Sequence, residues 1–165
     1  MSGYERHTHT IPPLYDSASR VLVLGSFPSP KSRESGFYYA HPQNRFWRIL
    51  SAVLGEPFPA TAEERRNMCL RRNIALWDVV AECDIVGASD AHIRSAVPND
   101  YNLILSACDI RAVFTVGRLA EKLYEKFTGR KGICLPSPSP ANRAVSDERM
   151  LEEYGRIADA LREER

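Results

Sequence analysis

The stretch RVLVLGSFPSPKSRESGFYYAHPQNRFW (residues 20–47) sets the fold, because it leaves an apolar strand through an unusually long connection. Most connections between a strand and the next helix take about two to six residues. Here Pro, Ser, Gly, aromatic residues and scattered cations fill the segment from Gly25 to Trp47. Loops of this length are usually disordered or functional, and the aromatic content argues against disorder. We therefore interpret the segment as a functional loop.

Short apolar or β-branched runs elsewhere in the chain predict strands, with helical patterns between them. The predicted strands are Arg20–Leu24, Ile74–Val79, Ala112–Val116 and Ile133–Leu135. The predicted helices cover 44–54, Thr61 to about Arg72, 117–127, a segment capped by Ser146, and two short helices within 89–107 broken at Pro98. Alternating strands and helices imply right-handed crossovers and a parallel sheet covered on both faces. The fold class is therefore α/β, a three-layer α/β/α arrangement around a central four-stranded parallel sheet.

Length and composition predict a single soluble domain. The chain has 165 residues, of which 44% are hydrophobic, enough for one sizeable core. We interpret residues 1–165 as one domain, with residues 1–18 as a flexible or peripheral N-terminal segment. No apolar stretch approaches the roughly 20 residues that span a bilayer, and the start lacks a secretory signal. We expect a cytoplasmic protein without a membrane partner.

The cysteines and the N-terminal histidines give no strong metal signal. The four cysteines lie far apart without C-x2-C spacing, which in a reducing compartment indicates buried or incidental thiols. An iron–sulfur or zinc site is the alternative. His7 and His9 form an H-x-H pair, yet a tail of this kind offers no further ligands. We expect no metal and no cofactor.

Charge argues against nucleic-acid binding by the molecule as a whole but allows it locally. The net charge is only +1, whereas affinity for DNA normally rests on neutralised phosphates. Between Lys31 and Arg48, however, four cations face one carboxylate, Glu34. The basic residues therefore fall in the long loop.

Four segments follow the predicted strands and should meet at one edge of the sheet. They are GSFPS, WDVV, TVGR and LPSPSPANR. In open parallel sheets, ligands bind at the carboxyl ends of the strands. Proline stiffens such loops, and serine offers donors suited to phosphate or sugar. The two Ser/Pro loops would form rigid walls around a polynucleotide backbone.

The motifs GSFPSPKS, YYAHPQNRFW, ALWDVV and LPSPSPAN together resemble the uracil-DNA glycosylase superfamily, and most closely its hypoxanthine (deoxyinosine) DNA glycosylase branch. The similarity runs in order from about Val21 to the last helix. It implies a four-stranded parallel sheet, no metal, and hydrolysis of the N-glycosidic bond of a deaminated base flipped from DNA. We accordingly expect DNA as the partner, and a monomer.

Two positions depart from the pattern of the better-known uracil enzymes. Phe27 stands where those enzymes carry an Asp or Asn that activates or positions water, and Leu135 stands where they often carry a His. In the hypoxanthine branch, the resemblance implies that the Asn of the AHPxN segment is catalytic, which is Asn44 here. The chemistry must therefore use other groups than a water-activating residue at position 27.

Three residues are candidates for catalysis. Asn44 cannot act as a general base, but its amide can align water through the carbonyl or hold a base edge. Asp78 ends the second predicted strand and could orient water, accept a proton from a base edge, or merely cap or brace a loop. His41 could supply a cation near the leaving base or brace the loop beside Pro42.

Other residues are candidates for binding. Phe27, Tyr39 and Ser26 are predicted to contact the flipped base, whereas Phe46 and Trp47 fit the core better than a stacking wall. The candidates for the DNA backbone are Ser29, Lys31, Arg45, Ser137, Ser139, Asn142 and Arg143. For the C-terminal loop, the alternative is a solvated proline-rich turn. The binding interpretation requires that Asn44 face this loop across a cleft wide enough for a purine.

Three functions fit the sequence. The first is a monofunctional glycosylase that releases hypoxanthine by simple hydrolysis, since no lysine stands at a motif position assignable to sugar attack. The second keeps the mechanism but acts on uracil or a mismatch that contains it. The third is a non-catalytic nucleotide or nucleic-acid binding domain of the same fold, which the changes at Phe27 and Leu135 keep open.

Overall fold

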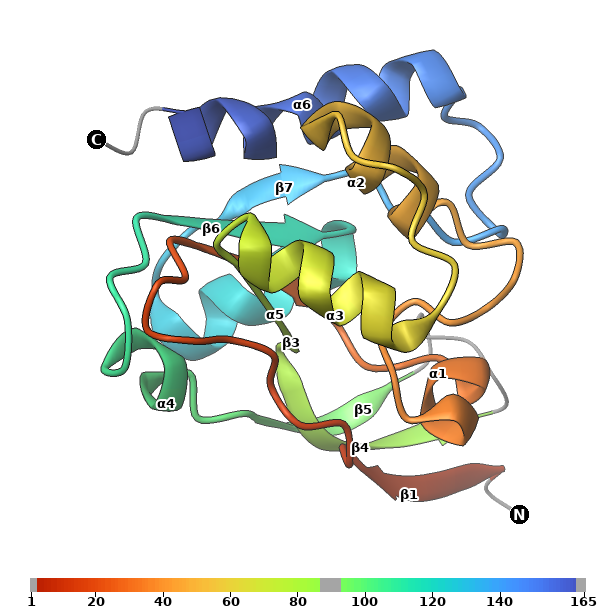
Figure 1. Ribbon diagram of the computed structural model, residues 1–165. Coiled ribbons are helices and arrows are strands. Elements are labelled where there is room, and N and C mark those ends of the chain that lie inside the picture. The colour runs from red at the N-terminus through yellow and green to blue at the C-terminus, as the bar shows by residue number, and fades with distance from the viewer. Residues whose placement is uncertain (1–2, 87–92, 163–165) are drawn as a thin grey trace.

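A computed structural model describes residues 3–86 and 93–162 of the chain (Figure 1). A four-stranded parallel sheet runs in the order β3-β2-β6-β7. Its strands are β2 (Val21–Gly25), β3 (Ile74–Asp78), β6 (Ala112–Val116) and β7 (Ile133–Leu135). Every residue of β2 and β3 is buried, as expected of strands covered on both faces. The predicted central sheet is confirmed.

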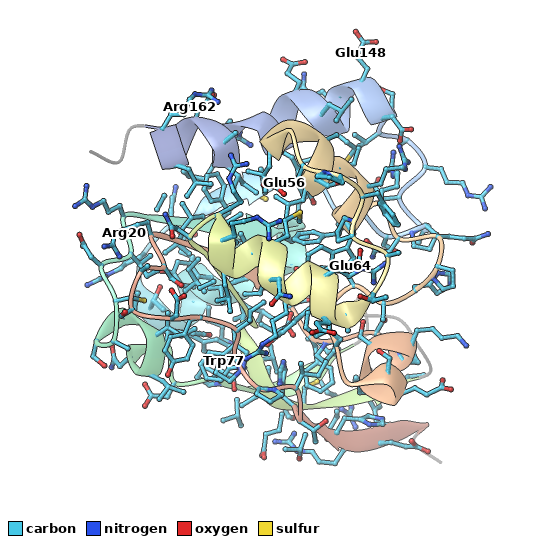
Figure 2. The ribbon with its side chains drawn as sticks, in the orientation of Figure 1. Arg20, Glu56, Glu64, Trp77, Glu148 and Arg162 are labelled. Carbon is cyan, nitrogen blue, oxygen red and sulfur yellow. The ribbon has the colours of Figure 1, made fainter. Side chains whose placement is uncertain are left out.

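Helices cover the sheet where the apolar periodicity placed them. α2 (Phe46–Leu54) and α6 (Asp147–Arg162) pack together on one side, and α5 (Arg118–Thr128) packs on β6 and β7 (Figure 1). α3 (Ala62–Arg71) packs against β3. Charged residues such as Glu148 and Arg162 project outward from α6, whereas Tyr154 and Ile157 on its inner face are fully buried (Figure 2).

The predicted helix ends are confirmed at their caps. Thr61 Oγ1 accepts a hydrogen bond from Glu64 N at 3.1 Å, and Ser146 Oγ accepts one from Arg149 N at 3.1 Å. Gly55 ends α2 with φ of 69°, a left-handed conformation that glycine adopts without a steric cost.

The long connection after β2 is ordered. Ser29 caps a short helix, α1 (Pro30–Ser35), and Gly36 ends it in a left-handed conformation. The aromatic residues that follow join the core: Phe46 and Trp47 are 0% and 1% exposed, and Trp47 Nε1 donates to Tyr38 O. The expectation that these two rings belong to the core is therefore correct.

A second sheet has no counterpart in the sequence-based prediction. β1 (Tyr4–Thr8), β4 (Val80–Val86) and β5 (Arg94–Pro98) form an antiparallel sheet in the order β1-β4-β5. The first of the two short helices expected within 89–107 is wrong, because residues 94–98 pair with β4; residues 89–92 lie outside the described part of the chain. The second exists as α4 (Asn102–Leu105).

The described part of the N-terminal segment, residues 3–18, begins with an edge strand and is attached to the rest of the fold at several points. β1 pairs with β4 over its whole length. Beyond it, Ile11 and Leu14 are only 3% and 1% exposed, and Leu14 exchanges backbone hydrogen bonds with Leu76. The segment is held in place because these two apolar side chains extend the hydrophobic core.

Within the described residues, no helix combines the length and the apolar character needed to cross a membrane.

Candidate active site

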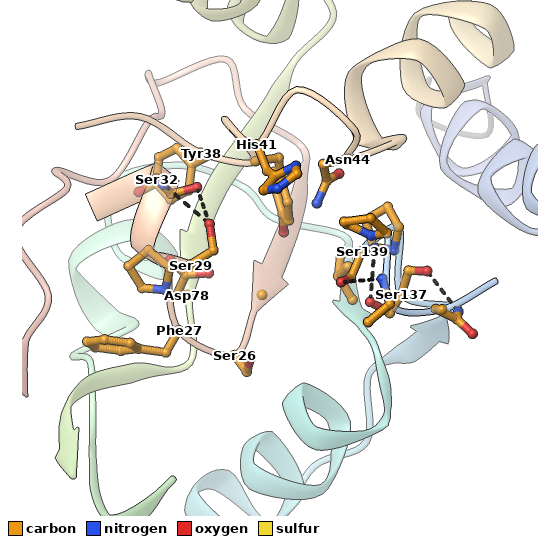
Figure 3. Close-up of a pocket in the computed structure, with 18 of the residues that line it drawn as sticks. Ser26, Phe27, Ser29, Ser32, Tyr38, His41, Asn44, Asp78, Ser137 and Ser139 are labelled. Carbon is orange, nitrogen blue, oxygen red and sulfur yellow. Dashed lines mark hydrogen bonds between the residues drawn. The ribbon is translucent and has the colours of Figure 1, made fainter. Parts of the chain in front are cut away.

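A pocket of about 770 Å³ opens at the carboxyl ends of the parallel strands (Figure 3). Its walls come from the loop after β2, the end of β3, and the loop after β7. The predicted site residues that line it are Ser26, Phe27, Ser29, Tyr39, His41, Asn44, Asp78, Ser137, Ser139 and Asn142. A volume of this size is typical of sites for small organic ligands and is ample for a purine.

Asn44 lies beside the N-terminus of α2 and faces the gap between His41 and Ser139 (Figure 3). Its Oδ1 accepts a hydrogen bond from Phe46 N at 2.8 Å, an Asx-type turn that starts the helix. Because the oxygen is engaged, the amide Nδ2 is the end that the residue presents to the pocket. Asn44 therefore offers an N–H donor to the pocket, whereas its carbonyl oxygen is already engaged.

Asp78 forms the floor of the pocket at the end of β3. The residue is 4% exposed, and its Oδ2 lies 2.7 Å from His9 Nε2. Its Oδ1 lies directly over Gly25, where an added Cβ would approach it to 2.4 Å. Only glycine leaves room for the carboxylate at this point. The glycine of the GSFPS motif, Gly25, is therefore required by the position of Asp78.

Two tyrosines flank the carboxylate. Tyr38 is 2% exposed and donates to Pro12 O at 2.8 Å; burial, and secondarily the charge of Asp78, raises the pKa of its hydroxyl. Tyr39 stacks on Phe46 with ring centroids 3.9 Å apart. Its φ of 51° is a left-handed conformation that costs a non-glycine residue about 1–2 kcal/mol, and such strain concentrates at functional sites.

The predicted base contacts differ in how accessible they are. Phe27 is 3% exposed, its ring meets His9 edge-on, and the Arg33 guanidinium lies 5.7 Å from its centroid. Figure 3 shows this ring on the side of the pocket away from Ser139. Ser26 is 7% exposed, and its backbone oxygen accepts from Val80 N. Tyr39 is half-buried and so remains the most open of the three predicted base contacts.

The loop after β7 is rigid through hydrogen bonds as well as proline. Ser137 Oγ accepts from Ser139 N, and Ser139 Oγ accepts from Ala141 N, both at 3.2 Å. Asn142 Nδ2 donates to Ser137 O at 2.9 Å. The serine oxygens and the Asn142 amide are therefore largely used to shape the loop, which presents a pre-formed wall to the pocket.

Arg45 ties this wall to the segment that carries Asn44. Its backbone N donates to Pro138 O at 3.0 Å, and its guanidinium donates to Asn142 O and Val145 O. The side chain is only 16% exposed. Arg45 therefore braces the two walls, a role that differs from the direct phosphate contact expected from the sequence.

Of the remaining predicted phosphate ligands, Arg143 and Lys31 do not line the main pocket, whereas Ser29 does. Arg143 lines an adjoining hollow of about 410 Å³, together with Arg45 and Arg48. Ser29 lines the main pocket, but its Oγ accepts from Ser32 N as the cap of α1. Lys31 is on the exposed surface of α1 and lies 4.0 Å from Glu34.

His41 lines the pocket beside Asn44 (Figure 3). Its Nδ1 accepts a hydrogen bond from Gln43 N at 3.1 Å. This contact places the imidazole proton of the neutral ring on Nε2. The ring therefore both braces its own loop and offers one N–H donor.

His9 is the site residue that the sequence did not reveal. Its side chain is 3% exposed and reaches Asp78, while His7, within β1, lies 3.6 Å from Glu5 at the surface. The H-x-H spacing did not distinguish the two residues, because His9 lies just beyond the end of β1. Without knowledge of β1, that spacing indicated only a weak metal motif.

Comparison with known proteins assigns the chain to a family. The model of the uracil DNA glycosylase superfamily matches residues 12–162. The chain belongs to the uracil DNA glycosylase superfamily, which confirms the resemblance carried by the four motifs.

Relatives and a solved structure agree with this assignment. A protein of Methanosarcina acetivorans named hypoxanthine DNA glycosylase is 34% identical, over 86% of this chain and 92% of the relative. A Methanosarcina barkeri protein of the same name is 33% identical, over 80% and 86%. The solution NMR structure of a candidate uracil DNA glycosylase from M. acetivorans superposes with a TM-score of 0.79 at 28% identity, covering 93% of this chain and 98% of that one.

Proposed function

We propose that this protein is a monofunctional DNA glycosylase that releases hypoxanthine from deoxyinosine in DNA. The main support for the proposal is that Asn44 and Asp78 line the same pocket. This pocket lies at the edge of the sheet where the superfamily motifs come together. The names of the relatives point to the same substrate.

The two side chains offer complementary groups to a lactam base. Asn44 presents an amide N–H donor, and Asp78 presents a carboxylate acceptor. Hypoxanthine carries an acceptor at O6 and a donor at N1, whereas adenine carries the reverse pattern. A pocket with this pair of groups therefore favours the deaminated base over its parent.

The chemistry follows from the same placement. Breaking the C–N bond develops positive charge on the sugar and negative charge on the departing purine. An N–H donor such as Asn44 stabilises the second of these charges if it contacts an acceptor of the leaving base. Phe27 stands where the better-known uracil enzymes carry an Asp or Asn that activates or positions water. We therefore infer that the attacking water enters from the open side of the pocket and is not activated by a general base.

Uracil is the second candidate substrate, because its O4 and N3–H present the same acceptor and donor edge. The size of the pocket, about 770 Å³, favours the larger purine. The test offers duplexes that contain deoxyinosine, deoxyuridine or deoxyxanthosine to the protein in the presence of a chelator. The expected result is fastest release of hypoxanthine, leaving an alkali-labile abasic site.

Three results would contradict parts of this proposal. Faster release of uracil would make it a uracil glycosylase. Binding of all three duplexes without cleavage would support a non-catalytic domain. Trapping of a protein–DNA adduct by borohydride would show attack by an amine in place of water.

We further infer that the chain works as a single-domain monomer in the cytoplasm. Support for one domain comes from the junction of the two sheets, since only Val79 separates β3 from β4. Size-exclusion chromatography with light scattering tests the monomer; a stable dimer would contradict it.

A further inference from the structure

The N-terminal segment brings one buried imidazole to the floor of the pocket, and the proposed chemistry does not use it. His9 Nε2 lies 2.7 Å from Asp78 Oδ2, and the two side chains are 3% and 5% exposed. An ionised carboxylate only accepts hydrogen bonds, so the imidazole donates through Nε2–H. A buried carboxylate needs such a partner, because leaving it unpaired away from water is costly.

His9 is fixed in place from several directions. Its backbone N donates to Ala81 O at 2.6 Å. Its ring meets the rings of Phe27 and Trp77 edge-on, with centroids 6.0 and 6.5 Å apart. The strand before it, β1, is paired with β4 throughout, and the segment after it is anchored at Leu14. The imidazole is therefore preorganised before any ligand binds.

This contact leaves one carboxylate oxygen for the pocket. Oδ2 is engaged with His9, whereas Oδ1 lies over Gly25 among the residues that line the cavity. Without His9, the carboxylate could turn and share its hydrogen bonds between both oxygens. With His9, a single acceptor has a fixed direction.

We propose that His9 is a positioning residue for base selection: it holds Asp78 so that Oδ1 accepts the N1–H of a lactam base. The inference rests on the proposed function, because it requires a base in this pocket. Hypoxanthine has a hydrogen at N1, which the fixed oxygen accepts. Adenine and unsubstituted purine have a lone pair there, which the oxygen repels.

The test measures binding to duplexes that cannot be cleaved. A 2′-fluoro-arabino nucleotide resists hydrolysis, because fluorine destabilises the oxocarbenium-like sugar. One duplex carries hypoxanthine on this sugar, and the other carries unsubstituted purine. Asn44 is intact in every variant, so a change in the ratio of the two dissociation constants reports on N1 recognition through Asp78.

The expected result is a preference for hypoxanthine in the wild-type protein that falls about tenfold in His9→Ala. His9→Gln should retain part of the preference, because its amide N–H can still donate to Asp78. The matched control is His7→Ala, two residues earlier within β1 and at the surface beside Glu5, which should keep the full preference. If His9 had a purely structural role, its loss would weaken the binding of both duplexes equally. The ratio of the two dissociation constants would then be unchanged.

The outcomes separate this inference from the proposed function. An unchanged ratio in His9→Ala, or no preference in the wild type, overturns the role of His9 whether or not the protein cleaves DNA. Failure of the wild type to cleave unmodified deoxyinosine, with the preference and its loss in His9→Ala both present, would overturn the enzymatic function alone. Thermal unfolding by circular dichroism verifies that each variant is folded.

Discussion

The two Ser/Pro loops have similar composition but different positions in the pocket. The loop after β2 is joined to the sheet, where Gly25 O and Ser26 O accept from Val79 N and Val80 N, and it forms the floor around Asp78. The loop after β7 is bonded mainly to itself and to Arg45, and it forms a wall. Under the proposed function, the first loop would determine where the base is recognised, and the second would determine how the DNA is bound.

The largest effect is expected at Asn44, which lies in the pocket between Asp78 and the loop after β7. This residue has two roles, as a proposed donor to the base and as an acceptor for Phe46 N. Asn44→Ala should lower the single-turnover cleavage rate by about 10² or more, because a donor to the leaving base is lost. It should also destabilise the fold by about 1 kcal/mol, since the bond to Phe46 N is lost.

Asn44→Asp is the matched variant, because its carboxylate keeps the acceptor for Phe46 N but cannot donate. We expect a loss of rate at least as large as in Asn44→Ala with the thermal stability restored. A wild-type rate in Asn44→Asp would remove the amide donor from the mechanism.

An intermediate effect is expected at Arg45, which holds the wall. Arg45→Ala removes its hydrogen bonds to Asn142 O and Val145 O, so the loop after β7 should loosen. We expect the apparent KM for duplex DNA to rise several-fold while kcat changes less than about twofold. Steady-state kinetics provide the measurement.

The control for Arg45 is Arg143→Ala, since that side chain is exposed and, within the described part of the chain, its hydrogen bond is a 3.4 Å contact from Nε to Pro140 O. If Arg143 contacts a phosphate, its loss should reduce the salt dependence of DNA binding by about one unit of slope and leave the unfolding temperature unchanged. Equal effects of both variants on stability would contradict the bracing role of Arg45.

The smallest effect concerns Asp147, the first residue of α6, which accepts hydrogen bonds from Arg45 and Arg48. Hydrogen bonds from Arg48 and then from Arg45 hold the pKa of this carboxyl below its usual value of 3.8. A lowered pKa means that the contact stabilises the fold at neutral pH and is lost as the pH falls through the folded-state pKa. Asp147→Asn should therefore lower the unfolding temperature at pH 7 by at most about 3 °C, and the difference should shrink as the pH falls through the folded-state pKa. A difference that persists in acid would contradict the ion pair.

The sequence predicted the parallel sheet because its strands and helices carry their own signals. β2 and β3 are continuous apolar runs, and Thr61 and Ser146 mark helix starts through local hydrogen bonds. The two edge strands of the antiparallel sheet carry no such signal, since only two residues of β1 and one of β5 are even partly buried. Short, mostly solvated edge strands resemble loops in sequence.

The site could be predicted as a set of residues but not as a network of contacts. The motifs identified most of the residues that line the pocket. They did not reveal that Arg45 is a brace, because its partners lie about a hundred residues later in the chain. They missed His9 for the same reason, since Asp78 is 69 residues away.

The anchoring of β1 has a practical consequence for anyone who prepares this protein. The first ten residues look dispensable, and a shortened clone or a bulky N-terminal fusion would seem harmless. Trimming them would remove His9 together with β1, the strand before it, while leaving the residues of the parallel sheet and of the four motifs in the chain. If His9 has the role proposed above, the selectivity of such a preparation would be weaker than that of the full chain and would be mistaken for it.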